Sequence, residues 1–136
     1  MIYRQRSILA NKALDFSVKI HELNRQLKEV YREYEVAGQI LRSGTSIGAN
    51  ICEGQYAQSC SDFINKYSIA RKEAAETLYW LDYLERIEVI SAEQYELLYG
   101  QGEELLKMLT AAILSKMRGR EETGNNLNDT DFPYLT

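Results

Sequence analysis

The 136-residue chain has the length of one domain with a modest core, and its 45% hydrophobic and 26% charged residues are ordinary globular values that exclude wholesale disorder. The net charge of −4 argues against a dedicated nucleic-acid-binding module. No apolar run reaches the roughly 18 residues that a membrane span needs, and the first residues lack the apolar stretch of a signal peptide. We therefore expect a cytoplasmic protein without a membrane partner.

The first predicted helix covers about residues 11–31, and Ser7 or Asn11 is placed to cap its start. Its apolar residues step by four and three in alternation, which is typical of helix-on-helix packing: Leu9, Ala13, Phe16, Ile20, Leu23, Leu27, Val30 and Tyr34. Residues 1–32 carry seven basic and three acidic side chains, whereas residues 73–104 carry one basic and nine acidic. This polarity fits either complementary contacts between helices or subunits, or two solvated faces of opposite sign.

The second predicted helix covers about residues 36–56 and is rich in small residues. Each glycine inside a helix costs about 1 kcal/mol relative to alanine, so we expect a neighbouring backbone to approach closely at Gly44 and Gly48. Four polar residues recur every three or four positions and share one face: Arg42, Ser46, Asn50 and Glu53. This face is either an ordinary polar flank or a set of groups that pair with a neighbouring helix or subunit.

The third predicted helix begins at a capping box formed by Ser59 and Asp62 and extends to about Val89. A second capping box, residues 91–94, opens a fourth helix that ends at about Arg118. The sequence therefore predicts an all-α, antiparallel, up-down-up-down four-helix bundle over residues 1–118. Residues 119–136 are polar and acidic without periodicity, which predicts a flexible, disordered tail whose apolar residues 132–135 either dock or stay mobile.

No residue pattern indicates catalysis, a cofactor or a metal. His21 is the only histidine and lies off the apolar seam, so we interpret it as a solvated surface residue. Cys52 and Cys60 are too few for a disulfide framework or a zinc site, and we expect free thiols. Gly44 and Gly48 lack the lysine of a phosphate-binding loop, and no nucleophile accompanies the paired acids. We predict that the protein is not an enzyme.

Residues 41–54 read LRSGTSIGANICEG, an arginine followed by S-I-x-A-N-I-x-E-G. This run resembles the signature of the four-helix-bundle family of 23S rRNA intervening-sequence proteins, and residues 62–64 and 76–81 resemble that family's third-helix patterns. The similarity covers about residues 10–118. It implies a four-helix subunit that assembles into a ring of five, with no enzymatic activity. Some members of the family are encoded inside insertions that interrupt 23S rRNA genes.

Two hypotheses for the function follow. The first is a homo-oligomeric scaffold or adaptor, a pentamer whose subunit interface is expected at Arg42, Ser46, Gly48, Ala49, Asn50, Glu53 and Gly54. The second is a weak RNA- or nucleic-acid-binding accessory protein that acts with rRNA or a reverse transcriptase, as the resemblance to the accessory variability determinant of diversity-generating retroelements implies. Its contacts are expected from Arg4, Arg6, Lys12, Lys19 and Arg25. Residues 1–118 hold 15 basic and 16 acidic side chains, a balance that disfavours phosphate binding.

Overall fold

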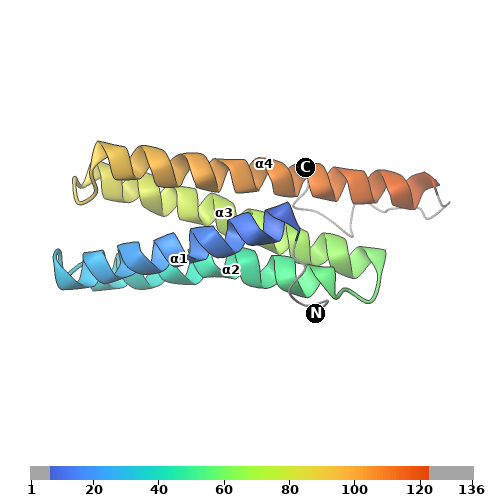
Figure 1. Ribbon diagram of the computed structural model, residues 1–136, viewed down its shortest axis with the longest axis horizontal. Helices are drawn as coiled ribbons and strands as arrows, with labels where there is room; N and C mark the ends of the chain where they lie inside the picture. Colours follow the sequence, from blue (N-terminus) through green and yellow to red (C-terminus); the bar gives the residue numbers. More distant parts are fainter. Residues whose placement is uncertain (1–6, 123–136) are drawn as a thin grey trace.

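The computed structural model describes residues 7–122, which form four α-helices and, within that range, no strand. These are α1 (Ile8–Glu29), α2 (Tyr34–Gln55), α3 (Cys60–Arg86) and α4 (Ala92–Glu122). Figure 1 shows them side by side along the length of the molecule, each running opposite to the one before. Consecutive helices pack extensively, and a smaller α1–α4 contact closes the bundle. The predicted all-α, up-down-up-down bundle is confirmed.

One core fills the space between the helices, and it is built from the seams that the sequence indicates. On α1, Phe16, Ile20 and Leu27 are buried, and on α2 the isoleucines Ile40 and Ile47 are buried against them. Burying one side chain of this size contributes about 1.5–3 kcal/mol relative to leaving it exposed. None of the helices within residues 7–122 is long and apolar enough to cross a membrane.

Three serines cap three helix starts, as their positions in the sequence predict. The Ser7 hydroxyl accepts a hydrogen bond from the Ala10 N–H at 3.1 Å, and Ser59 accepts one from Asp62 at 3.0 Å. Ser91 accepts one from Gln94 at 3.1 Å. Each bond satisfies an N–H that has no partner inside its helix, which is worth about 1 kcal/mol per cap.

Two helices end earlier than predicted because non-glycine residues adopt the left-handed conformation. Arg32 has φ 55° and Glu88 has φ 61°. Each makes a turn in which a later N–H returns to the preceding helix: Glu33 donates to the Leu27 carbonyl at 2.9 Å, and Val89 donates to Leu84 at 3.2 Å. The helices therefore end at Glu29 and Arg86, not near residues 31 and 89.

The fourth helix continues to Glu122, four residues beyond its predicted end. Gly119 does not stop it, because the neighbouring arginines and glutamates are good helix formers and a single glycine costs only about 1 kcal/mol. Residues 119–122 of the predicted tail are thus helical. The rest of that tail, residues 123–136, lies outside the described residues, as do residues 1–6.

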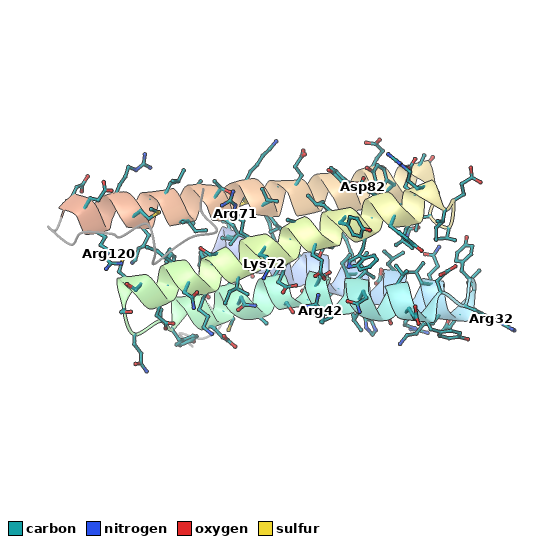
Figure 2. The ribbon with its side chains drawn as sticks, turned by 180° about the vertical axis from the view of Figure 1, so that it is seen from behind. Arg32, Arg42, Arg71, Lys72, Asp82 and Arg120 are labelled. Atoms are coloured by element: carbon teal, nitrogen blue, oxygen red, sulfur yellow. The ribbon has the colours of Figure 1, made fainter. Side chains whose placement is uncertain are left out.

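Near the α3–α4 turn, the Tyr95 hydroxyl donates to the Asp82 carboxylate at 2.5 Å. That hydrogen bond, with some burial, raises the pKa of Tyr95 to about 12. Figure 2 shows Asp82 at this end of the bundle, where α3 and α4 lie together. The contact ties the two helices beside the turn that joins them.

Candidate functional site

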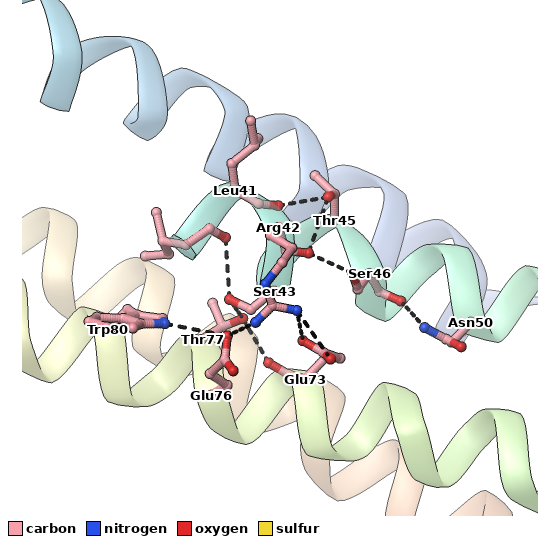
Figure 3. A network of polar contacts seen from close by, with 11 residues as sticks. Leu41, Arg42, Ser43, Thr45, Ser46, Asn50, Glu73, Glu76, Thr77 and Trp80 are labelled. Atoms are coloured by element: carbon pink, nitrogen blue, oxygen red, sulfur yellow. Dashed lines mark hydrogen bonds and ion pairs between the residues drawn. The ribbon is translucent and has the colours of Figure 1, made fainter. Parts of the chain in front are cut away.

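Arg42 joins the signature segment of α2 to α3. Its guanidinium Nη1 lies 3.2 Å from the Glu73 carboxylate, and its Nη2 pairs with the carboxylate of Glu76. The Glu76 carboxylate also accepts a hydrogen bond from Trp80 Nε1 at 3.4 Å. Figure 3 shows the arginine reaching across the gap between the helices to both acids. The Arg42 side chain is 49% exposed, so water screens these pairs and each is worth at most about 1 kcal/mol.

Beneath Arg42, a buried polar contact joins the same two helices. The hydroxyls of Ser43 and Thr77 are hydrogen-bonded to each other at 2.9 Å, and the Thr77 hydroxyl also lies 2.8 Å from the Glu73 carbonyl. Both residues are fully buried, so loss of either partner would leave a hydroxyl short of its bonds in the core. Sequence periodicity missed this pair, because serine and threonine interrupt the apolar pattern.

The other polar signature residues also have partners inside the chain. The Ser46 hydroxyl donates to the Arg42 carbonyl at 2.6 Å, and Asn50 Nδ2 donates to the Ser46 carbonyl at 2.8 Å. Glu53 pairs with Lys66 of α3 at 2.8 Å. This hydrogen bond and charge raise the pKa of Lys66 above its ordinary value. The four polar residues share one face, as predicted, and two of them pair with the neighbouring helix.

The glycines of the signature differ in the space around them. An added Cβ would lie 2.6 Å from the Tyr67 ring at Gly54 and 2.8 Å from Ile20 at Gly44, both too close for a real contact. At Gly48 the nearest atoms are those of Ala13, including its backbone, at 3.6 Å, which is an ordinary contact distance. The predicted close approach of a neighbouring backbone is therefore present at Gly48, but Gly44 and Gly54 are the tighter positions.

Small residues on the side of α2 away from α3 are exposed or half-buried, and α1 carries exposed apolar residues of its own. Ala13 of α1 lies against Gly48 of α2, the next residue along α1 is Leu14, and Val18 follows Leu14 one turn later. Leu14 is 46% exposed and Val18 52% exposed. We use the name outer strip for these two residues of α1 together with three small residues of α2; the α2 members are Thr45, Ala49 and Cys52.

The sequence did not predict Leu14 and Val18 as interface residues. Both fall outside the four-three seam of the first helix, and their spacing of four residues is the signal that marks a second apolar face. The predicted subunit interface stays a prediction; its residues are Arg42, Ser46, Gly48, Ala49, Asn50, Glu53 and Gly54. The structure adds that most of these residues also contribute to contacts within one chain.

The predicted nucleic-acid patch is not one surface in the described part of the chain. Arg4 and Arg6 lie outside residues 7–122. Lys12 pairs with Glu104 at 2.6 Å, and Arg25 pairs with Glu29 at 3.5 Å. Lys12 and Lys19 line a cavity of about 170 Å³ between α1 and α4, together with Asp15 and Glu104. Arg25 follows Lys19 by six residues, which separates the two side chains by about 120° around the helix. Acids therefore neighbour the lysines, and the arginine lies on another face.

The described residues hold no group of three or more histidine, cysteine, aspartate or glutamate side chains that suits a metal ion. His21 is exposed, as predicted. Cys52 and Cys60 are free thiols, as predicted. The fold and the signature segment together define a small four-helix-bundle protein. Most residues of that segment pack against a neighbouring helix or form polar contacts within the chain.

The chain belongs to the family of 23S rRNA-intervening sequence proteins, because the model of that family matches residues 5–111. Among solved structures it is similar to a protein of unknown function from the S23 ribosomal protein family of Bacteroides thetaiotaomicron, a crystal structure at 1.70 Å resolution. The two are 49% identical with a TM-score of 0.77, over 78% of this chain and 98% of the other. No curated protein matches the chain. Neither description names a catalytic activity.

Proposed function

We propose that this protein is a non-enzymatic, homo-oligomeric scaffold or adaptor whose subunits meet through the outer strip. The observation that carries the proposal is the exposure of Leu14 and Val18 on α1 and of small residues on α2, on a chain whose core does not include them. An apolar side chain that another subunit covers gains about 25 cal/mol per Å² removed from water. Small residues beside it let a second helix approach closely.

The signature segment also supports a subunit interface at the outer strip. Ile47, Ile51 and Gly54 are buried, and the polar positions have partners within the chain. Ala49 is different, because it is a fixed position of the family's pattern but is exposed and lies outside the core. A contact with another subunit would account for a small residue at this position, since a long side chain would hold two helices apart.

Five subunits are expected from the family resemblance. Light scattering on the purified protein should then give a mass of about 80 kDa, five times the 15.7 kDa chain. A monomer at micromolar concentration would contradict the proposal. RNA binding receives less support, because the basic residues expected to carry it are separated and partly paired with acids.

A further inference from the structure

An open pocket of about 470 Å³ lies at the end of the bundle where α3 begins and α4 ends. Its size is in the range of about 300–1,000 Å³ that is usual for binding pockets. The first turn of α3 contributes two residues and the last turns of α4 contribute five: Cys60, Phe63, Ala112, Ser115, Lys116, Gly119 and Arg120.

The pocket combines an apolar floor with a cationic rim. Phe63 stacks on Tyr67 with 4.0 Å between ring centroids, so its ring is held in place. Lys116 Nζ lies 4.9 Å from the centroid of the Phe63 ring, and no carboxylate within residues 7–122 pairs with this lysine. Arg120 Nη1 donates to the Ser61 hydroxyl at 2.7 Å, and Figure 2 shows Arg120 between the end of α4 and the start of α3. An acidic segment with aromatic residues has the complementary chemistry.

We propose that residues 129–135 of this same chain bind in the pocket. Their sequence, DTDFPYL, places Asp129 and Asp131 directly before the aromatic residues Phe132 and Tyr134. The acids match the charge of Lys116 on the rim, and the aromatic rings match Phe63. This proposal concerns a different surface from the proposed self-association, and it holds whether or not the subunits assemble.

The connecting chain is long enough for this placement. From Glu122 to Asp129 there are seven residues, which reach about 23 Å when extended. Lys116 lies only six helical residues before Glu122, about 9 Å along α4. Gly124, Asn125 and Asn126 fall in this connection, and glycine and asparagine favour the turns that reverse a chain.

The α4 side of the pocket and the proposed occupant occur in the same part of the chain. The family match ends at residue 111, whereas the α4 residues that line the pocket begin at Ala112. Residues 129–135 also follow that limit. The α4 side of the pocket and the proposed occupant therefore lie beyond the part that the family model matches, whereas Cys60 and Phe63 lie within it.

The two cysteines allow a direct test, because Cys60 lines the pocket and Cys52 lies on the outer strip. The reaction of each thiol with N-ethylmaleimide is followed by peptide mass spectrometry on the full chain. The test variant is Phe132→Ser with Tyr134→Ser, and the matched control is Asn125→Ser with Asn126→Ser. If docking is about nine-tenths populated, the test variant should raise the Cys60 rate roughly tenfold, because only the undocked fraction reacts. The control and the Cys52 rate should be unchanged.

Equal Cys60 rates in the wild-type protein and the test variant would overturn the proposal. A protection of Cys60 that disappears on dilution would also overturn it, because the occupant would then be the segment of a second copy. Asp129→Asn with Asp131→Asn should raise the Cys60 rate by a smaller factor, and added salt should reduce the wild-type protection. Since Cys52 reports the outer strip and Cys60 reports the pocket, failure of one proposal leaves a result distinct from failure of the other.

Discussion

The two sides of α2 meet different requirements. The side that faces α3 carries Arg42, Ser43 and Glu53, and each has a partner on α3. The outer strip carries Ala49 and Cys52, which are exposed. The same fourteen-residue signature therefore pairs α2 with α3 on one side and carries small exposed residues on the other.

This difference shows that a motif on a helix has to be divided by face before a function is assigned to it. Most of the signature residues are accounted for by packing within the chain, including the tight positions Gly44 and Gly54. What remains unexplained within one chain is the exposed part, Ala49 and Cys52, which we assign to the outer strip together with the exposed Leu14 and Val18. The following predictions test whether the two faces are independent.

The largest effect on stability is expected on the α3-facing side, from Gly54→Ala. The new Cβ would meet the Tyr67 ring at 2.6 Å, and that ring is buried and stacked on Phe63. Overpacking of this kind costs about 1–3 kcal/mol, which exceeds the gain in helix propensity. Urea unfolding measures the loss of unfolding free energy, and the dependence of that free energy on urea concentration should stay unchanged. Wild-type stability in this variant would show that the ring moves freely.

Gly48→Ala is the matched comparison, on the same helix but with room for a methyl group. The nearest atoms would be 3.6 Å away, so the alanine should be tolerated. We expect unfolding free energy to stay unchanged or to rise by up to about 1 kcal/mol, because alanine favours the helix. A loss comparable to that of Gly54→Ala would mean that Gly48 is also sterically required.

Thr77→Val removes the buried hydroxyl that links α3 to α2 and leaves Ser43 without its strongest partner. The expected cost is about 1–2 kcal/mol, because a buried polar group loses its bond. Thr110→Val on α4 is the control, since its hydroxyl bonds the Leu106 carbonyl of its own helix at 2.9 Å. Equal melting temperatures for the two variants would contradict a special role of the Ser43–Thr77 contact.

The smallest effect concerns the Glu53–Lys66 pair. Because Glu53 raises the pKa of Lys66 above 10.5, Glu53→Gln should lower it toward that value, which an NMR titration of the lysine side chain measures. The raised value means that the pair stabilises the folded protein below pH 10.5 and that this contribution is lost as pH rises through the folded-state pKa. An unchanged titration would show that the pair does not persist in solution.

Much of the fold could be predicted from the sequence, because long apolar seams and serine caps act locally. The helix ends at Glu29 and Arg86 could not, since neither Arg32 nor Glu88, which make the left-handed turns, is the glycine that normally marks such a turn. Within the site, the shared face of Arg42, Ser46, Asn50 and Glu53 followed from spacing alone. Their partners Glu73, Glu76 and Lys66 did not, because which face of α3 meets α2 depends on the packing of the whole bundle.

The most direct test of the central claim is the mass of Ala49→Arg in solution, measured by light scattering beside Ala75→Arg. Both alanines are exposed and helical, but Ala49 lies on the outer strip and Ala75 lies on α3. An arginine at the interface would hold subunits apart and place a charge in an apolar contact. We predict that Ala49→Arg gives the 15.7 kDa monomer, still helical by circular dichroism, while Ala75→Arg keeps a mass of about 80 kDa. Wild-type mass in both variants would contradict assembly through the outer strip.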